Sequence, residues 1–162
     1  MTTMYIDQSL ILQGIKVSSK EDALRLMATC MHEQGAVKAS YIEAIIEREN
    51  NYATGLPTKG VAVAIPHTDR EHVIKKSLCV GVLEEPVDFV IMGESEQTVP
   101  VKLIFMLAMD ENHAQLALLQ KLMSVFQNEQ ILLSLANETH KETIISLLRD
   151  ELDLTLEGGE NT

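Results

Sequence analysis

His67 stands at a position where the sequence predicts a reactive side chain. Residues 61–65 are Val-Ala-Val-Ala-Ile, an unbroken run of small or β-branched apolar residues that predicts a buried strand. Pro66 cannot donate a hydrogen bond to a sheet, so it ends the strand and leaves His67 at the strand end, where functional side chains tend to lie. Residues 68–71 are Thr-Asp-Arg-Glu, which has the form of a capping box and predicts a helix over about 68–76. The imidazole would then face a helix N-terminus, which favours an anion, and this combination suggests phosphoryl chemistry.

Two further polar side chains are predicted to lie at the ends of apolar elements. Arg48 is at the end of a predicted helix, and His113 comes just after a predicted strand. Ligand clefts form at the edge of an α/β sheet where strands end, so both residues can share a site with His67. Neutral imidazole, with an ordinary pKa of about 6.5, is a good nucleophile near neutral pH. The guanidinium of Arg48 can neutralise a bound phosphoryl group, and His113 can donate a hydrogen bond to the phosphoryl oxygens.

Other interpretations of these residues stay open. His67, Asp69 and His72 have H-x-D-x-x-H spacing and could bind a metal ion together with His113, as in a metal-dependent hydrolase. That spacing matches no common zinc pattern, and capping or a solvated helix face explains Asp69 and His72 equally well. A lone histidine can also be purely structural, and Arg48 has a sufficient structural reason to be basic because it lies at a helix C-terminus.

Five other stretches have the caps and apolar spacing of helices. Ser18 and Ser19 precede Glu21 in a capping-box arrangement, and the helix that follows ends at Gly35. A second helix opens at Ser40 by the same device and ends near 48–51. A third begins at about 110–113, and two more cover about 129–136 and 139–152. The inward face of the third helix is predicted to be Leu116, Leu119, Met123 and Phe126.

The predicted strands follow a Gly- and Pro-rich loop at 52–60. They cover 61–65, 78–83, a short segment at 87–91 after Pro86, and 101–109, which is the most apolar and is expected to be central. Strands and helices alternate irregularly, so we expect a single-domain α/β fold, with a mixed four- or five-stranded sheet flanked by helices. The domain is expected to cover 1–154, and 155–162, which contains Gly158 and Gly159, to form a disordered tail.

The composition is that of one globular domain and argues against several classes of function. The chain of 162 residues is 46% apolar and 23% charged, and it is long enough to bury a core without disulfides or metal ions. Its net charge of −11 would repel nucleic acid and anionic lipid. The apolar run at 103–109 is far too short to span a membrane, and no signal pattern begins the chain, so a cytoplasmic protein without membrane insertion is expected.

The chain resembles the enzyme IIA domain of the bacterial phosphoenolpyruvate-dependent sugar phosphotransferase system, in its fructose–mannitol–nitrogen superfamily. The resemblance spans about residues 5–152, and its core is the Ala-Ile-Pro-His signature that ends at His67. The family fold, a mixed sheet between helices, agrees with the fold expected from the pattern. The supporting matches are Arg48-Glu49, Thr54-Gly55-Leu56 and Glu111-Asn112-His113, followed by Leu116, Leu118, Leu119 and Leu122.

This resemblance implies a phosphocarrier. In the family, the histidine of the Ile-Pro-His run accepts a phosphoryl group from phospho-HPr and passes it to a cysteine of enzyme IIB, which phosphorylates the sugar entering through enzyme IIC. By resemblance, His67 is the phosphoacceptor and reacts through Nε2, while Arg48 neutralises the phosphate. His113 matches a second histidine near the phosphoryl group, which galactitol-type members do not always keep. Neither cofactor nor metal ion is implied, and enzymes IIB and IIC are expected to be separate polypeptides.

The resemblance leaves two branches of the family open. The residues at 54–56 and 66–68 are most similar to the galactitol type, in which Thr replaces the Gly that often follows the histidine, while Ala53 stands where Pro is common. Nitrogen-type enzyme IIA proteins share the histidine but control other proteins through their phosphorylation state. A regulatory module is therefore the alternative to a sugar-transport component.

Overall fold

The structure is a computed structural model that describes residues 2–6, 8–110, 112–152 and 154–157, and their side chains over 4–6, 8–110 and 116–152. The strands are β1 (Thr2–Tyr5), β2 (Ile11–Ile15), β3 (Gly55–Leu56), β4 (Ala62–Ala64), β5 (Ser77–Val90), β6 (Thr98–Ala108) and β7 (Leu154–Glu157). The helices are α1 (Lys20–Glu33), α2 (Ser40–Asn51), α3 (Asn112–Phe126), α4 (Glu129–Asn137) and α5 (Lys141–Leu152), with 3-10 turns η1 (Gln8–Leu10) and η2 (Arg70–His72).

The described strands form one mixed sheet, as the sequence predicts. Their order is β3-β4-β6-β5-β1-β7, and β2 pairs with β5 beside β1. β4 runs parallel to β6, whereas β5 is antiparallel to β6 over most of its length. The sheet has seven described strands and not the expected four or five, because it also includes β1, β3 and β7, each of four residues or fewer.

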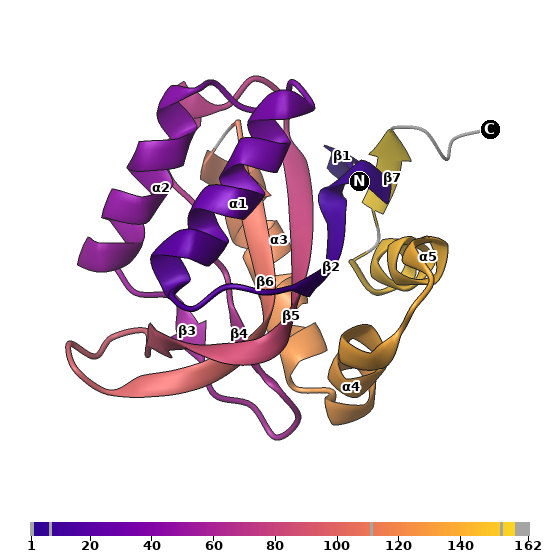
Figure 1. Ribbon diagram of the computed structural model, residues 1–162. Helices are drawn as coiled ribbons and strands as arrows, with labels where there is room; N and C mark the ends of the chain where they lie inside the picture. Colours follow the sequence, from indigo (N-terminus) through magenta and orange to yellow (C-terminus); the bar gives the residue numbers. More distant parts are fainter. Residues whose placement is uncertain (1, 7, 111, 153, 158–162) are drawn as a thin grey trace.

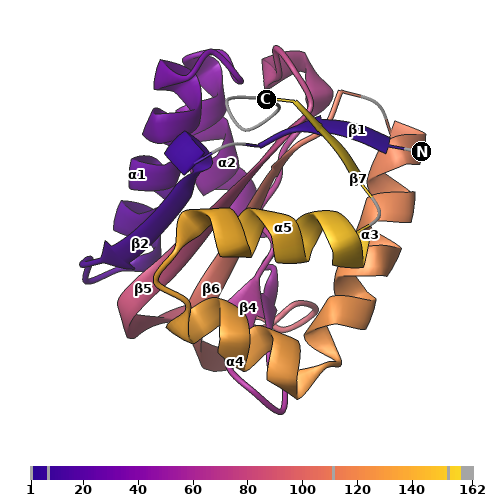
Figure 2. The same cartoon turned by 90° about the vertical axis from the view of Figure 1, so that its right-hand side faces the viewer.

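Two helical layers cover the two faces of the sheet. Figure 1 shows α1 and α2 side by side over one face, and Figure 2 shows α4 and α5 crossing the other face with α3 beside them. Side chains alternate along β5 between these layers: Leu78 and Val80 belong to the core under α3–α5, and Cys79 to the core under α1 and α2. Gly81 lets α1 approach closely, because a Cβ atom there would lie 2.6 Å from the Sδ atom of Met27. The described part of the chain contains no helix with the length and apolar character needed to cross a bilayer.

The helices begin and end close to their predicted positions, with two differences in detail. Ser19 caps α1 by accepting a hydrogen bond from the Asp22 N–H at 3.1 Å, as predicted. The predicted cap at Ser40 is wrong, since Ser40 is already helical and no side chain caps α2. The inward face of α3 is also partly wrong, because the side chain of Leu116 is 62% exposed. This helix is apolar around most of its circumference, so its period does not define one face. Over 116–126, where its side chains are described, the buried residues are Leu118, Leu122, Val125 and Phe126.

Two strand predictions are corrected by pairing between distant segments. The strands predicted at 78–83 and 87–91 are one strand, β5, since a register shift between Val82 and Val87 lets it continue alongside β6 past Pro86. The tail predicted to be disordered from residue 155 instead begins with β7, which pairs in parallel with β1 at the edge of the sheet. Four residues give too little periodicity to predict such a strand, and residues 158–162 lie outside the described part.

The helix predicted after His67 is not formed. Only η2 is helical there, and Asp69, not Thr68, precedes it without a capping side-chain hydrogen bond. The segment is held by the α1–α2 connection instead: Val73 bridges to Val37, and the Ile74 N–H donates to the Ala36 carbonyl at 2.9 Å. These long-range contacts extend the chain, so His67 does not face the N-terminus of a regular helix.

Candidate active site

His67 lies at the carboxyl edge of the sheet, beyond the end of β4. Parallel pairing of β4 with β6 places Ala64 opposite Ile104, and the Leu107 N–H donates to the Pro66 carbonyl at 3.0 Å. The backbone immediately before His67 is therefore held by β6. This confirms the predicted position of the histidine at a strand end.

One hydrogen bond sets the tautomer of the imidazole. The Nδ1 atom of His67 lies 3.0 Å from the carbonyl oxygen of Ile65. A carbonyl oxygen only accepts, so Nδ1 carries the proton in this contact. The lone pair of a neutral imidazole is then on Nε2, the nitrogen that the family resemblance implies as the nucleophile.

The surroundings of His67 favour the neutral ring. Burial lowers its pKa from the ordinary 6.5, and the positive charge of Arg48 lowers it further, while the Ile65 carbonyl and Asp69 act in the opposite direction. With the pKa below 6.5, the imidazole is mostly neutral at pH 7. The site therefore combines a nucleophilic nitrogen with a nearby fixed cation.

Arg48 occupies the last turn of α2 and faces the segment that follows His67. Its Nη1 atom lies 3.7 Å from a carboxylate oxygen of Asp69, and its guanidinium carbon lies 4.7 Å from the centre of the Tyr52 ring. Its Nε atom is buried and has no hydrogen-bond partner among the described groups. A guanidinium with one unused donor, held by a single long ion pair and a ring contact, can still bind an anion.

A buried carboxyl group lies beneath this site, and sequence reasoning did not assign it a role. Glu49 is 2% exposed, and its two oxygens accept hydrogen bonds from the N–H and the hydroxyl of Thr54, both at 2.8 Å. The hydroxyl of Thr54 in turn accepts from the Ile65 N–H at 3.2 Å. The signal in the sequence is an acid in the last turn of a helix, where the helix dipole disfavours negative charge.

His113 falls in the first turn of α3, and its side chain lies outside the described residues. Its backbone is at the expected edge of the sheet. β6 ends at Ala108 and α3 begins at Asn112, and parallel β4 and β6 end at the same edge. The role of His113 toward a phosphoryl group stays a prediction.

The metal-site interpretation receives no support from the described side chains. Among them, no three His, Cys, Asp or Glu residues lie close enough together to hold a metal ion. The Nδ1 atom of His72 is 2.9 Å from the hydroxyl of Ser40, and Asp69 pairs with Arg48. Two residues of the proposed pattern, Asp69 and His72, therefore have structural partners.

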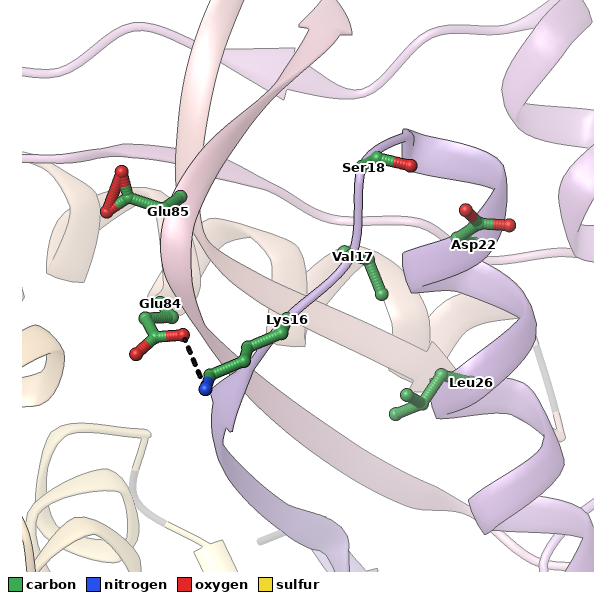
Figure 3. Close-up of a pocket in the computed structure, with 7 residues that line it drawn as sticks. All are labelled: Lys16, Val17, Ser18, Asp22, Leu26, Glu84 and Glu85. Atoms are coloured by element: carbon green, nitrogen blue, oxygen red, sulfur yellow. Dashed lines mark ion pairs between the residues drawn. The ribbon is translucent and has the colours of Figure 1, made fainter.

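Two other polar regions lie apart from His67. An open groove of about 650 Å³ lies between α1 and β5. Figure 3 shows residues that line it, among them Lys16, Leu26 and Glu84. Glu84 follows Val82, which pairs with Leu103, so the groove lies toward the amino end of β6, away from the carboxyl edge where His67 lies.

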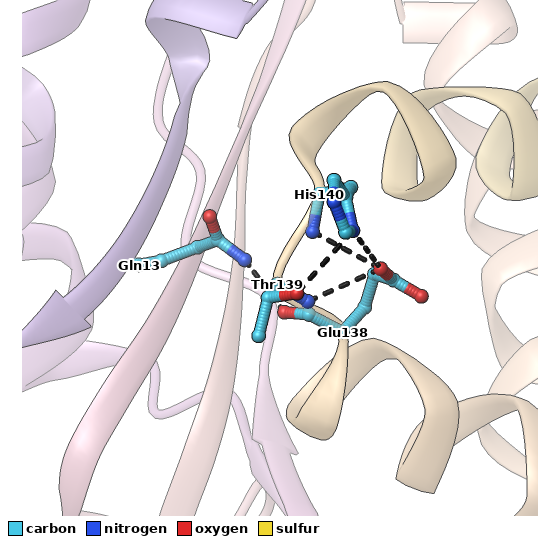
Figure 4. A network of polar contacts seen from close by, with 4 residues as sticks. All are labelled: Gln13, Glu138, Thr139 and His140. Atoms are coloured by element: carbon cyan, nitrogen blue, oxygen red, sulfur yellow. Dashed lines mark hydrogen bonds and ion pairs between the residues drawn. The ribbon is translucent and has the colours of Figure 1, made fainter.

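The second region is the connection between α4 and α5 and is shown in Figure 4. One carboxylate oxygen of Glu138 accepts from the backbone N–H groups of Thr139 and His140, and Gln13 donates to the Glu138 carbonyl at 2.6 Å. These contacts tie β2 to the α4–α5 connection. They explain His140 as a structural residue.

Comparison with known proteins identifies the family. The family model described as "Phosphoenolpyruvate-dependent sugar phosphotransferase system, EIIA 2" matches residues 4–151. The chain is 31% identical over 130 residues to the mannitol-specific phosphotransferase enzyme IIA component of Enterococcus faecalis, covering 78% of this chain and 85% of that protein. It is 27% identical over 151 residues to the mannitol-specific EIICBA component of Pasteurella multocida, covering 91% of this chain and 23% of that protein. The chain thus spans about a quarter of the length of that relative.

Two solved structures have the same fold. The complex of Escherichia coli enzyme IIA-Mtl with phosphorylated enzyme IIB-Mtl contains a chain with a TM-score of 0.74 and 23% identity, covering 91% of this chain and 99% of that chain. The nitrogen regulatory protein IIA-Ntr of Neisseria meningitidis has a TM-score of 0.71 and 26% identity, covering 88% of this chain and 94% of that chain. Because the family model matches nearly the whole described length, this chain belongs to the EIIA 2 family of the phosphoenolpyruvate-dependent sugar phosphotransferase system.

Proposed function

We propose that this protein is a phosphocarrier in which His67 is the phosphoacceptor. The observation that carries the proposal is the hydrogen bond from Nδ1 of His67 to the Ile65 carbonyl, which leaves the Nε2 lone pair available. In the first step, Nε2 forms a bond to phosphorus while the bond from phosphorus to the donor's histidine nitrogen breaks. The proton stays on Nδ1, and the Ile65 carbonyl stabilises the positive charge that the ring acquires.

The second step reverses the first with another nucleophile. A cysteine thiolate attacks the phosphorus, and the bond from phosphorus to Nε2 breaks. The imidazole leaves in its original neutral tautomer, so His67 needs neither to gain nor to lose a proton. The lowered pKa of His67 suits this role, because the ring is neutral at pH 7 before the reaction and neutral again after it.

Arg48 is proposed to neutralise the phosphoryl group. A phosphoryl group carries nearly two negative charges and competes for the guanidinium with Asp69, a single exposed carboxylate at 3.7 Å. The unpartnered Nε atom adds a donor that the resting site does not use. His113, at the same edge of the sheet, is proposed to donate a hydrogen bond to the phosphoryl oxygens.

The proposed partners follow from the family. Phospho-HPr is the donor and a cysteine of enzyme IIB the acceptor, with enzyme IIC in the membrane, and the reaction takes place in the cytoplasm. The E. coli complex named above joins enzyme IIA-Mtl to phosphorylated enzyme IIB-Mtl, which supports a IIB partner here. The sequence at 54–56 and 66–68 favours a galactitol-type system, whereas the relatives reported above are named for mannitol. Both sugars are hexitols, and we propose a hexitol system with the galactitol type as its first candidate.

Intact mass spectrometry tests the phosphocarrier directly. The protein is incubated with phosphoenolpyruvate, enzyme I and HPr, and its mass is measured before and after brief acid treatment. The expected result is the gain of one acid-labile phosphoryl group, which a His67→Ala variant does not acquire. His72→Ala is the matched control, since His72 has a structural partner in Ser40 and should leave labelling intact. Labelling of the His67→Ala variant would refute the assignment.

A regulatory module of the nitrogen type is the second candidate. The similarity to IIA-Ntr of N. meningitidis favours it, at 26% identity over 88% of this chain. Purified phosphoprotein mixed with IIB proteins of the galactitol and mannitol types distinguishes the two candidates. Transfer of the phosphoryl group to a IIB cysteine supports transport, and a phosphoprotein that transfers to neither supports regulation.

A further inference from the structure

The end of α2 and the end of β4 are joined by a series of hydrogen bonds that is buried except at its His67 end. Glu49 accepts two hydrogen bonds from Thr54, the Thr54 hydroxyl accepts from the Ile65 N–H, and the Ile65 carbonyl accepts from Nδ1 of His67. Glu49 and Thr54 are 2% and 4% exposed and are among the few buried polar side chains of the described part. Burial of an ionisable group is costly, so a structural or functional reason for it is expected.

The direction of each bond follows from its partners. Ionised Glu49 only accepts, so the Thr54 hydroxyl proton points toward it and leaves an oxygen lone pair for the Ile65 N–H. The N–H and the carbonyl of Ile65 belong to different peptide groups, so the link to His67 is positional. By holding the N–H of Ile65, Thr54 places the carbonyl that sets the imidazole tautomer.

Besides its contacts with Glu49 and Ile65, Thr54 is held in place by its neighbour in the chain. The next residue, Gly55, packs so closely on β5 that a Cβ atom there would lie 2.6 Å from the Val90 carbonyl oxygen. The Gly55 carbonyl also accepts from the Met92 N–H at 2.8 Å. Thr54 therefore provides a fixed point between Glu49, next to Arg48 in the chain, and Ile65, two residues before His67.

We propose that Glu49 and Thr54 are positioning residues for the phosphoryl-transfer reaction: they hold the Ile65 backbone that sets the tautomer of His67, and they keep the helix end that carries Arg48 in register with it. We call these two side chains the Glu49–Thr54 clamp. The proposal rests on the proposed function of His67, and it adds two buried residues to that site.

The clamp depends on the protonation state of Glu49. A protonated carboxyl donates through one oxygen, so the Thr54 hydroxyl would have to accept from it as well as from Ile65. Burial raises the pKa of Glu49 to about 7, while the two Thr54 hydrogen bonds and the charge of Lys20 at the start of α1 lower it. Among the described residues, the charges that shift the pKa of His67 are those of Arg48 and Asp69. When the pH falls through 7, protonation of Glu49 therefore weakens the hydrogen bonds of the clamp before His67 itself is protonated.

Four variants test the clamp. Glu49→Gln imitates the protonated carboxyl permanently, and Thr54→Val removes the hydroxyl while keeping the shape of the side chain. Thr54→Ser restores the hydroxyl and should restore the function. Glu47→Gln is the matched control, because Glu47 is an exposed acid on the same helix.

The first measurement is the imidazole ¹⁵N spectrum of His67 at pH 8, which reports the tautomer without any partner protein. Wild type, Thr54→Ser and Glu47→Gln should show the form protonated at Nδ1. Glu49→Gln and Thr54→Val should show a mixture of this form with the other tautomer.

The second measurement is the initial rate of phosphorylation by phospho-HPr between pH 5.5 and 8.5. At pH 8 we expect Glu49→Gln and Thr54→Val to be about three- to tenfold slower than wild type, the factor for one buried hydrogen bond. The wild-type rate should begin to fall near pH 7, and that of Glu49→Gln only below 6.5.

Two results separate this proposal from the proposed function. If Glu49→Gln and Thr54→Val unfold cooperatively, and still keep the wild-type tautomer and pH profile, the clamp is refuted while the phosphocarrier stands. If wild type accepts no phosphoryl group from active phospho-HPr, the proposed function fails, and the ¹⁵N spectra alone still decide whether the clamp sets the tautomer.

Discussion

The buried carboxyl of Glu49 should make the stability of this protein depend on pH. Its pKa is raised from 4.5 to about 7, chiefly by burial. Between these values the folded chain holds a proton that the unfolded chain has released, so the free energy of unfolding falls as pH rises through this window. Glu49→Gln carries no titrating group and removes that dependence.

The size of the effect follows from the two pKa values. The interval from 4.5 to about 7 corresponds to roughly 3 kcal/mol, at about 1.4 kcal/mol per pH unit. Gln resembles the protonated carboxyl, so the variant should be about as stable as wild type near pH 4.5. Above pH 7.5 it should be more stable by up to roughly 3 kcal/mol. A residue retained for positioning thus lowers stability at neutral pH, as is common at functional sites.

Urea unfolding followed by circular dichroism at pH 4.5, 5.5, 6.5, 7.5 and 8.5 measures this difference, with Glu47→Gln as the control. His67 contributes with the opposite sign: its folded pKa lies below 6.5, so the unfolded chain binds the extra proton and stability rises with pH just below that value. This contribution is confined to pH values below about 6.5, so the difference between wild type and Glu49→Gln above that pH reports Glu49. Parallel pH curves for wild type and Glu49→Gln would refute the reasoning, because they would mean that Glu49 titrates alike in the folded and unfolded chains.

Three further predictions concern the site and the core. Arg48→Ala should slow phosphorylation by phospho-HPr about 10- to 100-fold, since one charge-assisted bond contributes about 1.5–3 kcal/mol; stopped-flow rates equal to wild type would exclude its role. Asp69→Asn should lower the pKa of His67, because the Asp69 charge raises it, and an NMR titration in which this pKa stays constant or rises would contradict the assigned electrostatics. Gly81→Ala should lower the free energy of unfolding by about 1–3 kcal/mol, because the new Cβ would lie 2.6 Å from the Sδ atom of Met27; an unchanged Tm would show that Met27 moves aside without cost.

Much of the architecture is encoded in short stretches of the sequence. The apolar run before Pro66 predicts β4, and the proline predicts that His67 lies at a strand end. The helices from α1 to α5 follow from apolar spacing and caps that act over a few residues. Pro66 and the Ser19 cap act as predicted because the interactions behind them, a missing N–H and a hydrogen bond three residues away, are themselves local.

The errors come where distant segments compete with local preference. Residues 68–71 match the sequence motif of a capping box, yet the pairing of Val73 with Val37 keeps the chain extended. The edge strand β7 exists only because β1 offers it a partner at the other end of the chain. A local pattern carries no information about such partners, since they are brought together only by the completed sheet.

The same division applies to the site. The sequence by itself determined that His67 and Arg48 lie at the ends of apolar elements, and the resemblance implied what each would do. Only the folded structure showed which nitrogen of His67 is protonated, because the backbone conformation after β4 brings the Ile65 carbonyl to Nδ1. It alone decided the burial of Glu49, because the Thr54 hydroxyl meets the Ile65 N–H only when the segment after α2 lies beside the end of β4. Hydrogen bonds between elements depend on a register of a few tenths of an ångström, which residue types and spacing do not specify.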